Sequence, residues 1–321
     1  MVMYPQFILI SLLKILNKMH KNKNLKAVSY GEVLFDVFEN EKKIGGAPLN
    51  LALRIKSLGL DVAVISAIGN DENGKELKKY IEENGINIQC LITLPNHKTG
   101  VVNVFLDERG SATYNISFPS AWDFINVNEE IKMIVQEADI FFFGSLACRN
   151  DVSKKTLFEL LEINDKMFKV FDVNLRAPHY KIEVLEELMK KSDFIKFNDD
   201  EILEIASKMG SLSEQLENNI LFIAEKTDTK FICVTRGKHG SILLWEGKLY
   251  YNNGYTVKVT DTVGAGDSFL AALITKLNET KDPQYSLDFA SAVGAIVASK
   301  RGANPKIEKS EIEYFLEKEY K

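Results

Sequence analysis

The sequence predicts an α/β fold, a doubly wound and mainly parallel sheet flanked by helices, with a small β lid. Short apolar runs alternate with amphipathic helical segments along most of the chain, which is typical of a parallel sheet. The 321 residues suffice for one large core of this kind. One stretch breaks the alternation, because two strands follow each other there without a helix, and this predicts the lid.

The expected elements follow one another in the order of strand–helix–strand units. Runs rich in β-branched and aromatic residues predict strands, and apolar residues three or four positions apart predict helices. Strands are expected over 26–33, 62–68, 140–143, 170–174, 194–197, 231–234 and, as a β-like run, 255–259. Helices are expected over 47–58, 74–83, 129–138, 153–161 (with Ser153 as N-cap), 182–190 and 268–277. Right-handed crossovers between such strands place helices on both faces of the sheet.

The lid is expected from two separate segments. Residues 99–107 and 111–117 alternate apolar and polar side chains and are joined by the turn Glu108-Arg109-Gly110, which predicts a hairpin. Together with the segment around 35–45, this hairpin would cover the sheet edge at which open α/β folds bind ligands. We therefore expect one domain over 25–321, with a lid from about 35–45 and 97–120.

Residues 1–24 are expected to lie outside this domain. Their apolar run, 6–16, is too short to span a bilayer and contains Lys14. Positive charge follows the run, at Lys18 and Lys21, whereas a signal peptide carries it in front. We interpret the segment as an N-terminal extension, arising from a wrongly assigned start or disordered. A weakly amphipathic surface helix is the alternative.

Composition excludes several classes of function. Forty Lys and Arg against forty-five Asp and Glu give a net charge of -5, so nothing indicates binding to nucleic acid or to a membrane. The three cysteines lie in apolar runs and are typical of free thiols in a reducing compartment, which predicts a cytoplasmic protein. The four histidines are scattered, so their spacing does not indicate a transition-metal site.

The most informative motif is Asp261-Thr262-Val263-Gly264-Ala265-Gly266-Asp267-Ser268-Phe269. It precedes an apolar helix, so the amides of its glycine-rich turn would point at one spot and carry the positive end of the helix dipole. This cradle suits the charge on a transferring phosphoryl group. The carboxylate of Asp267 could accept a proton from an attacking hydroxyl. The alternative is that Asp267 only caps the helix.

The same motif resembles the C-terminal signature of the ribokinase-like (PfkB) sugar kinases. Gly45-Gly46-Ala47-Pro48-Leu49-Asn50 resembles the N-terminal signature of that family, and the resemblance extends from about residue 27 to 305. Within the family, Gly31–Asp36, Gly144–Ala147 and Phe171–Arg176 are most similar to bacterial fructokinases. The resemblance implies that Asp267 is the catalytic base. It also implies that the amides of Gly264, Ala265 and Gly266 form the anion hole.

The resemblance assigns sugar binding to Asp36, Gly46 and Asn50. From the residues alone, Asp36 could equally be a turn residue and Asn50 a polar residue early in a helix. Arg176 follows a strand end and would face the substrate, since some relatives use the equivalent arginine on the carboxylate of an acidic sugar. The alternative for Arg176 is a surface ion pair.

The resemblance also places ATP and its cations. Asn198 would contact a nucleotide phosphate and Glu201 would organise Mg²⁺ through water, although an N-cap with an acidic first turn explains both locally. Thr235 and Gly237 would lie near phosphate and ribose, unless their loop is only a hairpin turn. A monovalent cation, K⁺, would lie near Asp261 and the loop 301–303.

These features predict an ATP-dependent, Mg²⁺-using kinase that phosphorylates a primary hydroxyl of a ketohexose, converting fructose to fructose 6-phosphate. Kinases for 2-keto-3-deoxygluconate, ribose or a nucleoside are alternatives, as is a non-catalytic sugar-binding regulator on the same fold. A purely structural module would leave the spacing of the carboxylate and the glycines unexplained. The resemblance further implies a homodimer formed through the lid.

Overall fold

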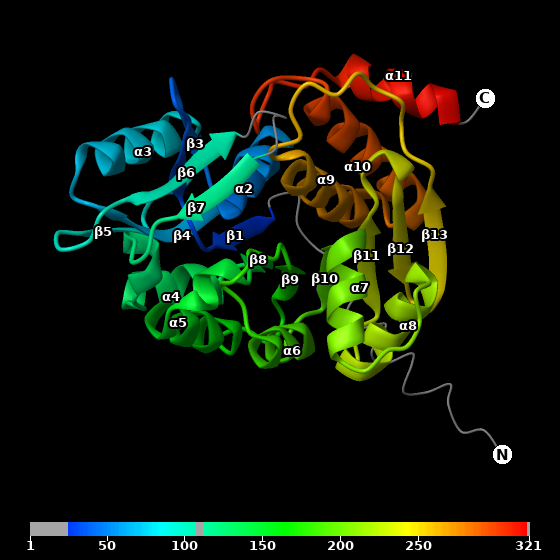
Figure 1. Cartoon of the computed structure of the whole chain (residues 1–321), viewed down its shortest axis with the longest axis horizontal. Coiled ribbons are helices and arrows are strands. Elements are labelled where there is room, and N and C mark those ends of the chain that lie inside the picture. Colours follow the sequence, from blue (N-terminus) through cyan, green and yellow to red (C-terminus); the bar gives the residue numbers. More distant parts are fainter. Residues whose placement is uncertain (1–24, 107–111, 320–321) are drawn as a thin grey trace.

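The computed structural model describes residues 25–106 and 112–319, and a nine-stranded sheet runs through them (Figure 1). Its strand order is β13-β12-β11-β10-β9-β8-β1-β4-β5. The strands are β1 (Lys26–Tyr30), β4 (Asp61–Gly69), β5 (Leu91–Leu94), β8 (Ile140–Gly144), β9 (Phe168–Asp172), β10 (Phe194–Asn198), β11 (Phe231–Thr235), β12 (Ser241–Trp245) and β13 (Lys248–Asn252). Only β12 is antiparallel, to both of its neighbours, so the expected mainly parallel sheet is confirmed.

Helices cover both faces of this sheet. One face carries α2 (Ala47–Ser57), α3 (Glu72–Glu83), α9 (Ala265–Thr280), α10 (Pro283–Ala298) and α11 (Lys309–Glu319). The other carries α4 (Glu129–Gln136), α5 (Asp151–Leu161), α6 (Ile182–Lys190), α7 (Asp199–Lys208) and α8 (Leu216–Thr227). Strand β8 serves both cores, because Phe142 packs into the first and its neighbours Phe141 and Phe143 pack into the second.

A second, four-stranded sheet corresponds to the expected lid. Its order is β3-β2-β6-β7, with β2 (Leu34–Val37), β3 (Lys42–Gly45), β6 (Gly100–Leu106) and β7 (Ala112–Ile116). Strands β6 and β7 pair antiparallel as expected, and the turn predicted at 108–110 lies outside the described residues. Leu34, Val102 and Val104 form a small apolar cluster of its own beneath this sheet.

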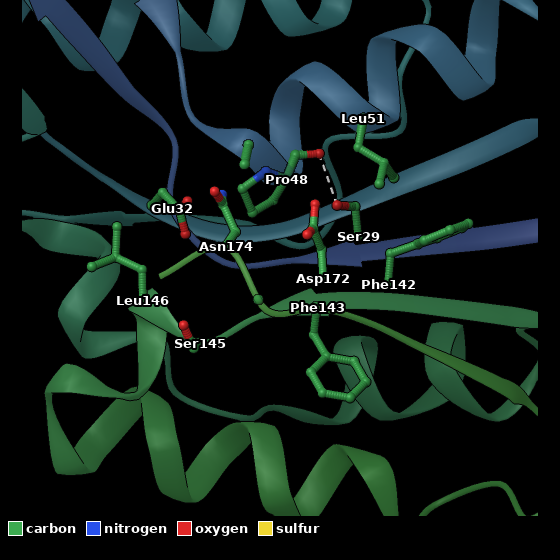
Figure 2. A pocket seen from close by; sticks show the side chains of 12 residues that line it. Ser29, Glu32, Pro48, Leu51, Phe142, Phe143, Ser145, Leu146, Asp172 and Asn174 are labelled. Carbon is green, nitrogen blue, oxygen red and sulfur yellow. Dashed lines mark hydrogen bonds between the residues drawn. The ribbon is translucent and has the colours of Figure 1, made fainter. Parts of the chain in front are cut away.

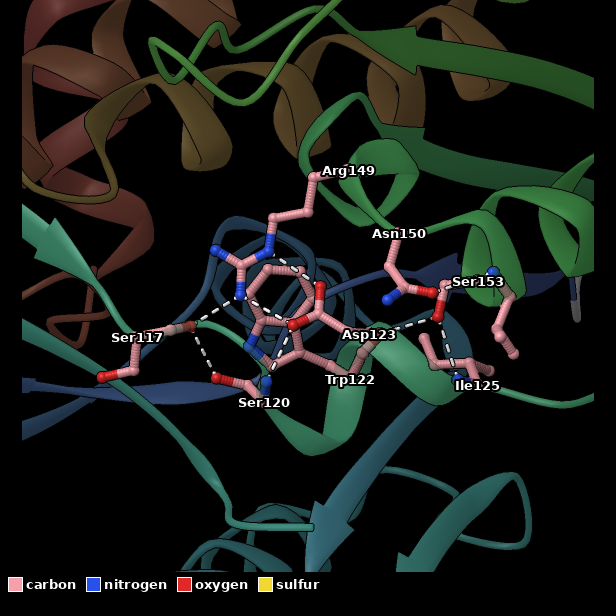
Figure 3. A network of polar contacts seen from close by, with 9 residues as sticks. Ser117, Ser120, Trp122, Asp123, Ile125, Arg149, Asn150 and Ser153 are labelled. Atoms are coloured by element: carbon pink, nitrogen blue, oxygen red, sulfur yellow. Dashed lines mark hydrogen bonds and ion pairs between the residues drawn. The ribbon is translucent and has the colours of Figure 1, made fainter.

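Arg149 fixes the chain that follows the lid (Figure 3). It ends the 3₁₀ helix η2 (Leu146–Arg149), and its guanidinium binds Asp123 of η1 (Ala121–Phe124) with two bonds of 2.7 and 2.8 Å. It also donates to the carbonyl of Ser117 at 2.7 Å and stacks over the ring of Trp122 at 3.9 Å. The side chains of Arg149 and Asp123 are 2% and 0% exposed, so this is a buried ion pair.

The strand expected over 26–33 is wrong in one respect, because it is divided between the two sheets. β1 ends at Tyr30 and β2 of the lid begins at Leu34. Gly31 adopts φ 145° at the break, a conformation open to glycine but unfavourable for other residues.

Two further local expectations are wrong. Helix α5 begins at Asp151 and is capped by Asn150, whose side chain accepts from the amide of Val152. Ser153 is instead buried within the helix and donates to the carbonyl of Trp122 at 2.8 Å. Residues 255–259 form no strand, because the main sheet ends at β13. Among the described helices, none has the length and apolar character needed to cross a bilayer.

Candidate active site

Some of the predicted site residues lie close together, where two helices begin beside the ends of parallel strands: Asn50 contacts Asp267, and the charge of Arg176 acts on Asp36 and Asp267. Helix α2 starts after Gly46 and helix α9 starts after Gly264, and the two helices pack against each other. Strands β9 and β10 contribute Asp172 and Lys196, which face each other in register. The carboxyl edge of a parallel sheet is the usual place for a ligand site in such folds.

Asp267 does not cap helix α9. The N-cap is Gly264, which has no side-chain capping bond, and Asp267 lies in the first turn. Its Oδ2 accepts a hydrogen bond of 3.0 Å from Nδ2 of Asn50, 217 positions away in the sequence. The Oδ1 of Asn50 in turn accepts from Asn304 at 3.1 Å, which fixes the amide orientation. Asn50 therefore holds one of the two carboxylate oxygens of Asp267.

The surroundings raise the pKa of Asp267 to about 6. Burial is the main cause, and the nearby charge of Asp172 adds to it. The hydrogen bond from Asn50 and the charges of Lys196 and Arg176 act in the opposite direction. A carboxylate with this pKa is ionised at neutral pH and is a stronger base than an ordinary aspartate.

The amides at the start of α9 differ in whether they have a hydrogen-bond partner among the described residues. Ser268 donates the first helical bond, to Gly264 at 2.9 Å, so the amide of Gly266 precedes the helical ladder. The amides of Gly264 and Gly266 donate to no other described residue. The amide of Ala265 instead donates to the carbonyl of Thr262 at 3.2 Å. The expected participation of Ala265 in an anion hole is therefore not supported, since a tight turn engages its amide.

Glycine is required at position 264. Its φ of 75° lies in the left-handed region, and a Cβ there would collide with the carbonyl oxygen of Ala303. This close approach brings the loop 301–303 against the start of α9.

Two of the expected sugar-binding residues lie in or next to the lid, Asp36 in β2 and Gly46 directly after β3. Asp36 is in strand β2, not in a turn, and burial raises the pKa of its carboxyl, partly opposed by the charges of Arg176 and Lys43. Gly46 caps α2 with φ 106°, and a Cβ there would collide with the carbonyl of Glu32. Arg176 is exposed, donates to the carbonyl of Leu175 at 2.9 Å and has no ion-pair partner among the described residues.

Sequence reasoning missed the polar residues of a small cavity of about 20 Å³ (Figure 2). Glu32, Asp172 and Asn174 line it, together with Ser29 and Ser145. Glu32 is only 4% exposed, and its Oε2 has no hydrogen-bond partner among the described residues. Glu32 and Asp172 belong to segments that resemble fructokinases, so the signal was present, but their burial could not be read from the sequence.

Burial raises the pKa of Glu32 to about 7, against a usual value of 4.5. The unfolded chain therefore releases this proton at lower pH than the folded one, and stability falls as the pH rises from about 4.5 to 7. We expect Glu32→Gln, which resembles the neutral acid, to be more stable than the parent at pH 8 by about 3 kcal/mol, and little different at pH 4.5. Urea unfolding at both pH values measures the difference. An equal difference at the two pH values would contradict this reasoning.

Asn198 and Glu201 form a complete capping box at the start of α7. The amide of Glu201 donates to Oδ1 of Asn198, and the amide of Asn198 donates to Oε2 of Glu201, both at 2.8 Å. Oε1 of Glu201 also accepts from Leu175 at 2.9 Å. The local explanation is thus realised, and Nδ2 of Asn198 takes no part in the capping box.

Thr235 and Gly237 connect two antiparallel strands, β11 and β12. The connection contains the short 3₁₀ helix η3 (Gly237–His239), and no atom lies within 4 Å of the place a Cβ would occupy on Gly237. The hairpin alternative is therefore correct as a description of the backbone, and the open space at Gly237 is compatible with a ligand.

Asp261 joins the two loops expected to hold a monovalent cation. Its Oδ1 accepts from the amide of Val263 at 3.0 Å, and its Oδ2 accepts from the amide of Gly302 at 3.2 Å. No group of three or more His, Cys, Asp or Glu side chains in the described part of the chain is arranged to hold a metal ion. A cation here would have to be bound mainly by backbone carbonyls or brought in by a ligand.

Comparison with known proteins agrees with this geometry. The family model described as "pfkB family carbohydrate kinase" matches residues 18–310. A protein of Pyrococcus horikoshii that carries the name "Putative sugar kinase" is 30% identical over 289 residues, covering 87% of this chain and 88% of the relative. The fructokinase of Salmonella typhimurium is 26% identical over 298 residues, covering 87% and 95%.

Solved structures share the fold over nearly the whole chain. The Pyrococcus horikoshii sugar kinase in complex with ATP has a TM-score of 0.77 at 27% identity, covering 91% of this chain and 100% of that chain. A 2-dehydro-3-deoxygluconokinase from Thermotoga maritima has a TM-score of 0.82 at 19% identity, covering 93% and 100%. A double mutant of the Vibrio cholerae fructokinase, with fructose, ADP and potassium bound, has a TM-score of 0.79 at 23% identity, covering 92% and 100%.

Proposed function

Since the chain belongs to the pfkB family of carbohydrate kinases, we propose that it transfers the γ-phosphoryl group of ATP to a primary hydroxyl of a ketohexose, converting fructose to fructose 6-phosphate. One observation carries the proposal. The carboxylate of Asp267 is held by Asn50 at the start of α9, next to the amides of Gly264 and Gly266, which donate to no residue that the structure describes. A base and an anion cradle then lie within one helical turn of each other.

Each of these residues has its own role in sugar binding or in phosphoryl transfer. Asp36 and Gly46 bind the sugar from the lid side and from the start of α2, and Asn50 keeps Asp267 oriented. Asp267 accepts the hydroxyl proton through the oxygen that Asn50 leaves open. The amides of Gly264 and Gly266 donate to the phosphoryl oxygens as charge develops on them. Closure of the lid excludes water and so limits hydrolysis of ATP.

The donor set at the start of α9 fits a phosphate. Asn198, Thr235 and Gly237 would hold the rest of the nucleotide, from the ends of β10 and β11. Mg²⁺ bound to ATP would neutralise charge on the phosphates. Glu201 would act on it only through water, because two backbone amides already occupy its carboxylate. A K⁺ site at Asp261 and a homodimer through the lid stay predictions.

2-Keto-3-deoxygluconate is the second candidate substrate, and Arg176 is the observation that favours it. Its guanidinium is exposed and unpaired by any described carboxylate, and its charge partly opposes the rise in the pKa of both Asp36 and Asp267. An arginine in this position could bind the carboxylate of an acidic sugar. The two candidates differ in charge, so the arginine distinguishes them.

A coupled ADP-release assay with fructose, ribose and 2-keto-3-deoxygluconate tests the substrate. We expect fructose to give the highest kcat/KM, and Arg176→Gln to change that value by about tenfold or less, since no ionic partner is lost. If the acidic sugar were the substrate, the same variant would lose about 10²-fold in kcat/KM for it. Turnover of the acid but not of fructose would overturn the assignment of fructose.

Two measurements on the parent protein, sugar binding and ADP release, test the alternative of a non-catalytic sugar-binding regulator. Sugar binding measured by calorimetry, without ADP release for any sugar, would favour a regulator over a kinase.

The three cysteines of the chain are all free, which supports a reducing compartment, and the cytoplasm is the proposed location.

A further inference from the structure

A buried lysine lies beside the proposed phosphate cradle. Lys196 is in strand β10 and is only 6% exposed. Its Nζ is 3.0 Å from Oδ1 of Asp172, which is in register with it on strand β9 and is also buried. Asp172 is the last residue of β9, and Lys196 lies two residues before the end of β10.

The ammonium of Lys196 points at the start of α9. Its Nζ lies 3.3 Å from the place that a Cβ would occupy on Gly266, so the absence of a side chain at this glycine leaves room for it. The amide of Gly266 is one of the cradle's donors that have no partner among the described residues. The ammonium of Lys196 and the backbone amide of Gly266 therefore lie close together at the start of α9.

The ammonium also has unused hydrogen-bonding capacity. A lysine side chain has three N–H donors, and Asp172 is the one partner of this ammonium among the described residues. A buried ammonium with free donors is costly to fold unless a ligand satisfies it. If the ion pair with Asp172 were purely structural, the other N–H groups of Lys196 would have no acceptor among the described residues.

The side chain of Lys196 is protonated, and so positively charged, at neutral pH. Burial alone would lower the pKa of Lys196, but the carboxylates of Asp172, Glu201 and Asp267 raise it above its usual value. Lys196 is thus a fixed positive charge at neutral pH and cannot serve as a base.

We propose that Lys196 is a further catalytic residue, which donates hydrogen bonds to the phosphoryl group during transfer, and that Asp172 positions it. The inference rests on the proposed function, because it takes the cradle of α9 as the place of the γ-phosphoryl group. The bond from phosphorus to the leaving oxygen of ADP breaks while the bond to the sugar oxygen forms. The hydroxyl proton goes to Asp267, and Lys196 keeps its own protons throughout.

The first test compares binding of two nucleotides. Lys196→Met should weaken binding of a non-hydrolysable ATP analogue by about tenfold or more in calorimetry, since a charge-assisted hydrogen bond to the γ-phosphate is lost. Binding of ADP, which lacks that phosphate, should be unchanged. Turnover should fall by about 10²–10³ in kcat, as for loss of one preorganised donor, with the KM for the sugar little changed.

The second test distinguishes loss of catalysis from loss of the folded structure. Lys196→Met leaves Asp172 buried without its partner, so Lys196→Met/Asp172→Asn removes both charges and should fold more stably. Lys276→Met is the matched control, since Lys276 is a partly buried lysine paired with Glu279 towards the other end of α9, and it should keep parental kinetics.

The pH profile of kcat/KM gives a readout that a structural role would not move. Lys196 lowers the pKa of Asp267 and Asp172 raises it. The acidic limb should therefore move to higher pH in Lys196→Met and to lower pH in Asp172→Asn.

Two results would overturn the inference. A folded double variant with parental kcat would show that no charge is needed at position 196. An equal loss of affinity for ADP and for the ATP analogue would show that the lysine does not distinguish the γ-phosphate. Absence of ADP release by the parent protein with every sugar would instead defeat the proposed function, and the comparison of the two nucleotides would still test Lys196.

Discussion

Asp267→Asn is expected to lower kcat by about 10² to 10⁴, with little change in the KM for sugar or ATP. The substitution keeps the shape of the side chain but replaces the carboxylate with a neutral amide, which is too weakly basic to accept the hydroxyl proton. The hydrogen bond from Asn50 holds Asp267 in the folded protein, so the site is preorganised before the substrate arrives. The loss should therefore fall on the chemical step and not on binding, as measured by steady-state kinetics of ADP release.

Two comparisons make this result specific. Asn50→Ala removes the group that orients Asp267 without removing the base, so its loss of kcat should be smaller than that of Asp267→Asn. Asp282→Asn is a matched control, because Asp282 caps the neighbouring helix α10 just beyond the end of α9, whereas Asp267 lies in the first turn of α9. Near-parental turnover by Asp267→Asn would contradict the assignment of the base.

Arg149→Met is expected to lower the free energy of unfolding by about 3–5 kcal/mol, the largest effect on stability that we expect. The substitution leaves Asp123, which is fully buried, as an unpaired charge. It also removes the bond to the carbonyl of Ser117, which ties the end of the lid to η2. Chemical denaturation at neutral pH measures the change.

The companion variants separate charge from packing. Arg149→Met/Asp123→Asn removes the stranded charge, so its loss of stability should be smaller than that of Arg149→Met alone. Lys154→Met breaks a partly exposed pair with Asp151 and should cost less than about 1 kcal/mol. Equal losses for Arg149→Met and Lys154→Met would show that the buried pair contributes no more than a surface pair.

The sequence was sufficient for the architecture because its signals are local. The alternation of apolar runs and amphipathic segments indicates a parallel sheet, and the hairpin of β6 and β7 follows from two alternating runs. The errors have equally local causes. Asn150 caps α5 in place of Ser153, and Gly31 divides a run that had looked like one strand.

The site was only partly predictable, because its contacts join distant parts of the chain. Two motifs suggested Asn50 and Asp267 separately, but their hydrogen bond spans 217 positions and depends on the packing of α2 against α9. The pairing of Lys196 with Asp172 depends on the register of two strands. The bond from Ala265 to Thr262 depends on the backbone conformation of one turn. None of these follows from residue type alone.

The pH dependence of kcat/KM tests the role of Asp267 most directly. We expect the rate to fall below about pH 6, since the carboxyl has a pKa of about 6 and must be ionised to accept a proton. The profile is best recorded in the Glu32→Gln background, because the pKa of Glu32 lies at about 7. This acidic limb should be absent from the residual activity of Asp267→Asn in the same background. The same limb in both proteins would show that another group is the base.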